Sequence, residues 1–319
     1  MEIPKSEVGD VAPSSIAHIV GQRAVVEQIK VGLDAAQIDG EKFPNSLLVG
    51  PPGAGKSCLA NVVAAEMATD FFEVLGQSIT SIGDLNALLL QATDRAVVHI
   101  DECHELRKDF QTALYLALDK QTVFVNGGRK GSTPMGIPIA NFTLLLSTTD
   151  EFCLLQPLRD RQRLVLRFQF YSDDELTKLL LHRTRSLGWD IHEEILPLIA
   201  QRSRGTPRLA LRLLQSCRRV CRAEGADEIT ADHLRRACGL EQIDVYGLGP
   251  TEQQYLRLLS DGPMRLNVVA SMLGLPTRTV SQVQEPFLLR AGLVVKDDQG
   301  RRNLSKAGYD HLNGVQHDE

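Results

Sequence analysis

A glycine-rich segment followed by lysine and serine has the most specific chemistry in this sequence of 319 residues. Residues 50–57 read Gly-Pro-Pro-Gly-Ala-Gly-Lys-Ser and fit the pattern G-x-x-x-x-G-K-[ST]. An apolar run that reads as a buried strand, 46–49, precedes the segment, and a run with helical spacing of apolar residues, 58–68, follows it. A loop between a strand end and a helix N-terminus presents backbone N–H groups to a polyphosphate. The sequence therefore predicts a phosphate-binding loop here.

Each residue type in this loop suits a task. Glycines let the backbone turn or approach phosphates closely, Lys56 adds a mobile positive charge, and the Ser57 hydroxyl is a ligand for Mg²⁺. A chance glycine turn is the alternative, and the order strand, loop, helix argues against it. The predicted nucleotide-binding residues of this segment are Gly53, Ala54, Gly55, Lys56, Ser57 and Cys58.

Two adjacent carboxylates end a second apolar strand, 96–101. Asp101 can face the Mg²⁺, which makes it the second predicted metal ligand beside Ser57, and Glu102 can face the γ-phosphate and the attacking water. Paired acids that merely end a strand are common, but together with the loop the functional interpretation is favoured.

The composition is that of an ordinary soluble protein and does not indicate nucleic-acid binding. Its 35 basic and 40 acidic side chains give a net charge of −5, so any DNA contact must come from a local patch. The six cysteines form no C-x-x-C pair, which indicates neither a disulfide framework nor a zinc site. No apolar run approaches the roughly 20 residues of a membrane span, and the polar start lacks a signal-peptide core, so a cytoplasmic location is expected.

The order of elements predicts three domains. Strands at 46–49, 71–75, 96–101, 142–146 and 164–168 alternate with helices, which predicts an α/β fold with a parallel sheet covered on both faces. From a capping box at Ser172 and Glu175 onward the pattern is helical, near 173–182, 193–203, 207–223 and 230–238. Helices at 252–260, 266–273 and 277–289 followed by a hairpin at 292–304 predict a winged helix. The expected domains are 1–171, 172–240 and 247–319.

A separate hairpin is expected at 122–139. Two short strands there flank a glycine-rich basic tip, which is typical of a protruding partner surface. On local sequence alone, a disordered surface loop has comparable weight.

Taken together, these motifs resemble those of AAA+ ATPases and, more narrowly, the RuvB family of Holliday-junction branch-migration motors. The likeness covers almost the full length. It rests on the following segments: 20–22, 50–56, 101–104, 142–144, 148–149, 157–161, 170–171, 205–208, 285–286 and 291–292.

The resemblance implies ATP hydrolysis and a role for each matching side chain. Lys56 would hold phosphate, Glu102 would orient or deprotonate the attacking water, and Thr149 would sense the γ-phosphate. Arg161 would be a finger inserted into the neighbouring subunit's site, which implies a homo-oligomeric ring, expected to be a hexamer. The remaining nucleotide contacts implied are Ile19, Val20, Arg159, Tyr171 and the lid-domain sensor Arg208.

The resemblance also implies a DNA client and protein partners in recombination, DNA repair and the SOS response to DNA damage. Lys296 and Arg301 match phosphate-contacting positions of the wing, and Arg302 adjoins them. The hairpin 122–139 corresponds to the surface that binds a RuvA-like junction-binding protein, and a RuvC-like resolvase could join the complex. No membrane partner is implied.

Several positions depart from the family's pattern. Residues 12–14 lack the usual Arg-Pro, residues 162–163 are Gln-Arg, Asp150 follows Thr149, and the wing carries Asp297 and Asp298. We interpret these as divergence in partner or DNA contacts. The leading hypothesis is a DNA-translocating motor; the alternatives are an ATP-dependent loader or switch on DNA without processive movement, and a non-enzymatic transcriptional regulator, against which Glu102 and Arg161 argue.

Overall fold

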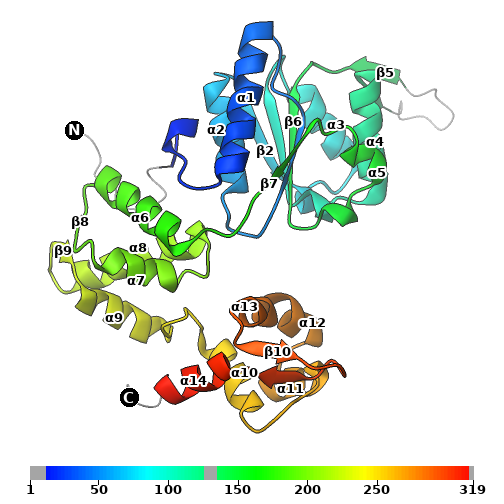
Figure 1. Ribbon diagram of the computed structural model, residues 1–319. Coiled ribbons are helices and arrows are strands. Elements are labelled where there is room, and N and C mark those ends of the chain that lie inside the picture. The colour runs from blue at the N-terminus through cyan, green and yellow to red at the C-terminus, as the bar shows by residue number, and fades with distance from the viewer. Residues whose placement is uncertain (1–11, 126–134, 316–319) are drawn as a thin grey trace. The chain divides into compact units, whose positions relative to one another are not determined.

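The computed structural model describes residues 12–125 and 135–315 (Figure 1). By contacts between residues the chain divides into two compact units. The first runs to Gly188 and includes Gly205–Leu211, and the second comprises Trp189–Arg204 and the chain from Arg212 onward. The three domain boundaries expected from the sequence stay a prediction.

A parallel sheet forms the centre of the first unit. Its strand order is β2-β3-β6-β1-β7, and every neighbouring pair is parallel. The α/β fold predicted from alternating strands and helices is therefore confirmed. The strands are β1 (Ser46–Val49), β2 (Phe71–Leu75), β3 (Val97–Asp101), β6 (Thr143–Thr148) and β7 (Leu164–Arg167).

Helices cover both faces of this sheet (Figure 1). Side chains alternate along each strand, so Leu47 packs with α3 (Ile82–Gln91) and α4 (Lys108–Lys120), while Leu48 packs with α1 (Arg23–Asp39) and α2 (Lys56–Glu66). Both faces are thus apolar, which explains why the strands read as continuous hydrophobic runs. The carboxyl ends of β1, β3 and β6 meet at one edge, where the phosphate loop and the acidic pair lie.

One apolar residue of α1 faces away from the core. Val31 is 61% exposed, whereas Val25, Ile29 and Leu33 are buried. The buried positions follow one helical stripe, and Val31 lies two residues from both Ile29 and Leu33, which places it on the opposite face of the helix.

The expected hairpin has its two strands. β4 (Thr122–Val125) pairs antiparallel with β5 (Met135–Pro138). The basic tip that the sequence pattern singled out, 126–132, lies outside the described residues. Phe124 and Met135 are exposed on these strands.

Short elements and α6 complete the first unit. Helix α6 (Asp173–Leu187) begins with the predicted capping box: the Glu175 N–H donates to Ser172 Oγ at 3.2 Å, and the Ser172 N–H donates to Glu175 Oε2 at 3.0 Å. The short elements are η2 (Ile16–His18), η3 (Gly76–Ser78), η4 (Cys103–Glu105), η5 (Glu151–Cys153) and α5 (Gln156–Arg159).

The second unit begins with the rest of the helical region. It holds α7 (Ile195–Gln201), α9 (Ala231–Glu241) and α8 (Pro207–Ala223) from Arg212 onward. Two short parallel strands, β8 (Asp190–Ile191) and β9 (Glu228–Ile229), join its loops and were not predicted.

The winged helix has its own core in the second unit. Tyr255, Leu256, Val269 and Leu288 are among its buried side chains. The predicted third helix is α12 (Thr277–Thr279), a π-helical segment η6 (Val280–Gln284) and α13 (Glu285–Arg290). Pro286 lacks an N–H, so a local change of helix type before it is expected. The other elements are α10 (Pro250–Leu259), α11 (Leu266–Leu273), the wing strands β10 (Val294–Lys296) and β11 (Arg302–Leu304), and α14 (Lys306–Val315), which was not predicted.

Within residues 12–125 and 135–315, every helix is too short or too polar to cross a bilayer.

Candidate active site

The phosphate loop folds as its residue types require. Gly53 and Gly55 have φ of 75° and 97°, in the region that glycine adopts without strain. A Cβ at Gly50 would lie 2.6 Å from Phe168 Cβ and 2.7 Å from its carbonyl oxygen, so only glycine fits there. Helix α2 begins directly after Gly55. The loop therefore leaves the first N–H groups of α2 free to receive an anion.

Lys56 is held inside this loop. Its ammonium donates to the carbonyls of Gly50 and Pro51 at 2.9 and 3.1 Å, and the residue is buried. Burial lowers the pKa of Lys56, while the charges of Glu102 and Asp101 oppose that shift. An ammonium has three N–H groups, so one remains for a phosphate oxygen.

Ser57 and Asp101 are brought together from α2 and β3. Ser57 Oγ donates to Asp101 Oδ2 at 2.8 Å. A hydroxyl and a carboxylate at one point are oxygen ligands of the kind Mg²⁺ uses when substrate phosphates and water complete its coordination. No cluster of three or more His, Cys, Asp or Glu side chains able to hold a metal occurs in the part of the chain that the structure describes. The residues thus fit a magnesium ion shared with a nucleotide and not an all-protein metal centre.

Glu102 occupies an unusual backbone position next to Asp101. Its φ is 48°, and its N–H donates to Asp101 Oδ1 at 2.9 Å. Among the described residues Glu102 Oε2 is buried without a hydrogen-bond partner, and His104 Nδ1 lies 3.3 Å from it, within ion-pair distance. A buried carboxylate oxygen that makes no hydrogen bond is costly unless it serves a function. It is available to accept a proton from water.

Two residues at the end of β6 complete this region. The Thr148 hydroxyl lies 3.1 Å from His104 Nδ1, which links β6 to the acidic pair. Thr149, the predicted sensor, is exposed and lines a hollow of about 340 Å³ together with Glu102, His104 and Pro52. The structure therefore places Thr149 on the same hollow as Glu102.

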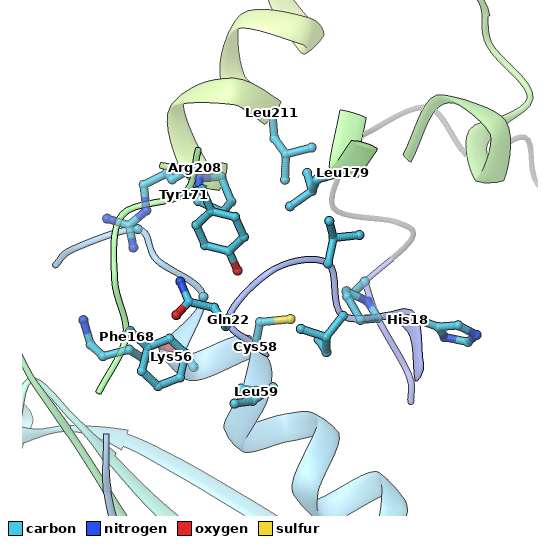
Figure 2. A pocket seen from close by; sticks show the side chains of 18 of the residues that line it. His18, Gln22, Lys56, Cys58, Leu59, Phe168, Tyr171, Leu179, Arg208 and Leu211 are labelled. Carbon is cyan, nitrogen blue, oxygen red and sulfur yellow. The ribbon is translucent and has the colours of Figure 1, made fainter. Parts of the chain in front are cut away.

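A cavity of about 560 Å³ lies between the phosphate loop, the N-terminal turn, α6 and the start of α8. This is the size of an ordinary small-molecule site. Figure 2 shows Leu179 and Leu211 facing it from one side and Cys58 and Leu59 from the other, with Tyr171 and Gln22 between them. One end is thus charged and the other is apolar, which matches a nucleotide with its phosphates at Lys56 and its base among apolar groups.

Most of the predicted nucleotide contacts line this cavity. They are Ile19, Val20, Gly53, Gly55, Lys56, Ser57, Cys58, Tyr171 and Arg208. Ala54 is fully buried within the loop. The Arg208 N–H donates to the Gly53 carbonyl at 3.4 Å, which fixes the start of α8 against the phosphate loop.

The two arginines of the 157–161 segment do not line this cavity within the described chain. Arg159 lies on α5, where its guanidinium stacks over Phe152 at 5.6 Å, and Arg161 follows α5 and pairs with Asp119. A residue that serves a neighbouring subunit would not reach its own pocket, so this placement is compatible with the predicted role of Arg161.

The predicted DNA contacts lie in the wing, and each is paired with an acidic side chain. Lys296 Nζ is 3.0 Å from Glu285 Oε2, and its side chain is 43% exposed. Arg302 also pairs with Glu285, but its side chain is only 12% exposed. Arg301 Nε donates to Asp297 Oδ2 at 2.7 Å. Among these three, Lys296 and Arg301 are the more accessible to a phosphate.

Sequence reasoning missed several residues of the site. Gln22 lines the cavity, and its side-chain amide donates to the Gln169 carbonyl at 2.7 Å. Leu179 and His182 reach it from α6. No local signal marks them, because an amphipathic helix does not reveal which of its side chains border a pocket; the Gly-Gln turn at 21–22 was the one available indication.

Family models match three consecutive parts of the chain. They are the Holliday junction DNA helicase RuvB P-loop domain at residues 11–168, the RuvB AAA lid domain at 171–244, and the RuvB C-terminal winged helix domain at 245–313.

Individual proteins match along most of their length. The Holliday junction branch migration complex subunit RuvB of Kosmotoga olearia is 35% identical over 306 residues, which cover 94% of this chain and 89% of that protein. Its counterpart from Granulibacter bethesdensis is 35% identical over 305 residues, with 94% and 85% covered. The solved structure of the Thermotoga maritima RuvB Holliday junction branch migration motor has a TM-score of 0.81 at 33% identity, with 95% of this chain and 98% of that chain covered.

Proposed function

The chain belongs to the RuvB family, and we propose that it is the ATP-hydrolysing motor subunit of a complex that moves Holliday junctions. The observation that supports this most directly is the hydrogen bond of 2.8 Å between Ser57 and Asp101, next to Glu102, whose Oε2 is buried and makes no hydrogen bond within the described chain. In this proposal, these groups surround the γ-phosphate of a nucleotide bound in the loop. A nucleotide-binding module without hydrolysis has no use for such a carboxylate.

Each side chain has a separate role in phosphoryl transfer. Lys56 and the N–H groups that open α2 bind the phosphates, and Ser57 and Asp101 would hold Mg²⁺, which neutralises phosphate charge when bound. Glu102 orients the attacking water and accepts its proton, while Thr149 contacts the γ-phosphate from the neighbouring strand. Tyr171 and the apolar wall hold the base end, and Arg208 connects the nucleotide to the start of α8.

Arg161 completes the site of the neighbouring subunit in this proposal. Because Arg161 does not line the cavity of its own chain, hydrolysis would depend on assembly. The assembly is a homo-oligomeric ring, a hexamer by family resemblance. An arginine supplied in this way contributes roughly 10³-fold or more to phosphoryl transfer. Arg159, on the same segment, would contribute to nucleotide binding or to the subunit contact.

DNA and protein partners belong to the same proposal. Lys296 and Arg301 of the wing would contact DNA phosphates, with Arg302 supporting them, and such contacts suit a motor because they carry no sequence information. The hairpin 122–139, with Phe124 and Met135 exposed, would bind a RuvA-like protein, and a RuvC-like resolvase would act on the same junction. The work would take place in the cytoplasm during recombination and repair of DNA damage.

Branch migration of a synthetic four-way junction tests this proposal. ATP, Mg²⁺ and a RuvA-type protein should give strand exchange, and Glu102→Gln should bind ATP and stop migration. The matched control is Glu105→Gln, which removes an exposed carboxylate three residues away.

Hydrolysis without migration, with the partner present, would contradict the motor and support a loader or switch. One observation favours that second candidate. Arg301 is already paired with Asp297 and Arg302 with Glu285, which weakens the binding of DNA phosphates by the wing.

A further inference from the structure

The guanidinium of Arg161 is held by a set of partners at the end of α4. Its Nε donates to Asp119 Oδ1 at 2.7 Å, and its Nη2 donates to Asp119 Oδ2. Its Nη1 donates to the Pro157 carbonyl, and its plane lies over the Tyr115 ring at 4.8 Å from the ring centre. A bidentate carboxylate, a carbonyl and an aromatic face together restrict the side chain far more than a single ion pair.

These contacts do not use all the N–H groups of the guanidinium. A guanidinium has five N–H groups, and Asp119 takes one on Nε and one on Nη2, while Pro157 takes one on Nη1. One N–H therefore remains on each terminal nitrogen within the described contacts. These N–H groups can donate to phosphate oxygens without breaking the contacts to Asp119 and Pro157. The arginine is therefore held in one orientation while some of its N–H groups stay available to a ligand.

The partners come from rigid elements. Tyr115 and Asp119 are four residues apart on α4, so they lie one turn apart on one face of a helix that packs on the sheet through Phe110 and Leu114. Pro157 lies on α5, whose Leu158 packs in the same core. The hydrogen bond from the Arg161 guanidinium lowers the pKa of Asp119, which keeps the carboxylate ionised and preserves the ion pair. An arginine supported in this way has already lost the conformational freedom of its side chain before it contacts a ligand.

We propose that Asp119, with the Tyr115 ring beneath the guanidinium, is the positioning residue for the arginine finger that Arg161 supplies to the neighbouring subunit. The inference rests on the proposed function, because it requires Arg161 to act on a neighbour's nucleotide. The ordinary alternative is an exposed salt bridge of no functional weight: the Arg161 and Asp119 side chains are 29% and 41% exposed. Such a pair would change activity little when removed.

Mixed rings test this inference. Glu102→Gln subunits cannot hydrolyse ATP but keep Arg161, and Arg161→Ala subunits keep a complete site but supply no finger. Mixing the two should restore ATP hydrolysis at the Arg161→Ala sites that have a Glu102→Gln neighbour. Asp119→Ala is then added to one subunit type at a time, and kcat and KM for ATP are measured.

Asp119→Ala in the finger-donating subunit should lower the restored kcat by about tenfold to a hundredfold, the cost of a misplaced group, with little change in KM. The same substitution in the Arg161→Ala subunit should have no effect, because that subunit has no finger to position. Asp119→Asn, which keeps one acceptor oxygen, should restore an intermediate kcat.

Three results would contradict the inference. Full restoration by the Asp119→Ala donor would show that the pair has no functional weight. Equal losses in donor and acceptor would show a general structural effect. If the mixture without an Asp119 substitution restored no hydrolysis, Arg161 would not act on a neighbouring subunit. That result would contradict the proposed function itself, independently of Asp119.

Discussion

At the residue scale, the position of Glu102 depends on a glycine far from it in the sequence. Glu102 has a left-handed backbone, which a non-glycine residue adopts only when its surroundings hold it there. A Cβ placed on Gly76 would lie 2.6 Å from the Glu102 carbonyl oxygen and 3.3 Å from Cys103 Cα. Gly76 in η3 therefore allows η3 and η4 to meet closely, and that contact sets the direction of the Glu102 side chain.

Gly76→Ala should therefore reduce turnover without preventing nucleotide binding. The added methyl group must push the Glu102 backbone away, and a displacement of this kind costs up to about a hundredfold in kcat. Steady-state ATP hydrolysis and the binding of a fluorescent ATP analogue measure the two effects. Gly83→Ala is the control, because its Cβ would meet only Ser81 Oγ at 3.4 Å. Loss of ATP binding in Gly76→Ala would contradict the assignment.

A second residue, His99, ties three strands together beneath the site. It is fully buried on β3, with Nδ1 3.0 Å from Glu73 Oε1 and Nε2 2.7 Å from Ser147 Oγ. In the neutral imidazole, Nδ1–H donates to the Glu73 carboxylate and Nε2 accepts from the Ser147 hydroxyl, so both contacts are made without a charge on the ring. Burial lowers the pKa of His99, although Asp101 and Glu73 favour its charged form.

The free energy of unfolding should consequently decrease as pH falls below the ordinary histidine pKa. The unfolded chain binds a proton there that the folded chain does not, so stability is complete above about pH 6.5 and declines through the lowered pKa. Urea unfolding between about pH 5 and pH 8 measures this. In His99→Gln the slope below about pH 6.5 should be flatter by up to about 1.4 kcal/mol per pH unit. An unchanged slope would mean that another group carries the dependence.

At the element scale, the winged helix depends on one buried carboxylate. Glu285, at the start of α13, is 2% exposed and accepts from the Tyr255 hydroxyl at 2.9 Å. Arg302 of β11 and Lys296 of β10 pair with the same carboxylate. The hydrogen bonds from these cations and from Tyr255 lower the pKa of Glu285, against the opposing effect of burial. One side chain thus joins α10, α13 and both wing strands.

Removing this charge should unfold the winged helix more easily. Glu285→Ala leaves Arg302 buried without its partner, and breaking a buried pair in this way costs about 3–5 kcal/mol. Calorimetry of the full chain should show a lower Tm for one transition. Glu252→Ala is no suitable control, since it pairs with Arg204, so the comparison is Asp298→Ala on the exposed wing tip. Equal Tm values for Glu285→Ala and Asp298→Ala would contradict this role.

The elements that sequence could predict are those with local signals. The phosphate loop and the pair Asp101 and Glu102 depend on a few consecutive residues, and the strands and their order along the chain depend on apolar runs. Helix α14 was missed because its pattern is short and follows a charged wing. The link between Asp119 and Arg161 spans 42 residues. A contact of that separation is decided by packing of α4 against α5, and no pattern in either segment reveals it.

At the scale of the whole molecule, the question is how hydrolysis in one unit changes the other. The chain crosses between the two compact units at three places, and one of them is the peptide bond between Arg204 and Gly205. Gly205 belongs with the nucleotide site, where its carbonyl accepts from the Tyr171 N–H at 2.9 Å. The connecting chain is therefore anchored within one unit immediately after the division.

The other side of the division is anchored in the second unit. Arg204 Nε donates to the Gly247 carbonyl and its Nη1 to Glu252 Oε1, both at 2.8 Å, and its guanidinium lies over the Phe287 ring at 5.0 Å. Its own carbonyl accepts from Arg290 at 2.6 Å. Arg204 thereby fixes the end of the α7 loop to α10 and α13 of the winged helix. Movement of Gly205 with the nucleotide site would reach the winged helix through one covalent step.

Arg204→Ala should accordingly separate hydrolysis from movement of DNA. None of its contacts touches the nucleotide cavity, so ATP hydrolysis should remain within about threefold of the unaltered protein, while migration per ATP hydrolysed should fall at least tenfold, since this coupling is worth about 1.4 kcal/mol or more. Paired assays of phosphate release and four-way junction migration give the ratio. Arg235→Ala, which removes an exposed arginine of α9 that pairs with Asp232 three residues earlier, is the control. If Arg204→Ala lost hydrolysis and migration in parallel, the residue would serve folding or the catalytic site; if it kept both, the winged helix would be driven by another connection.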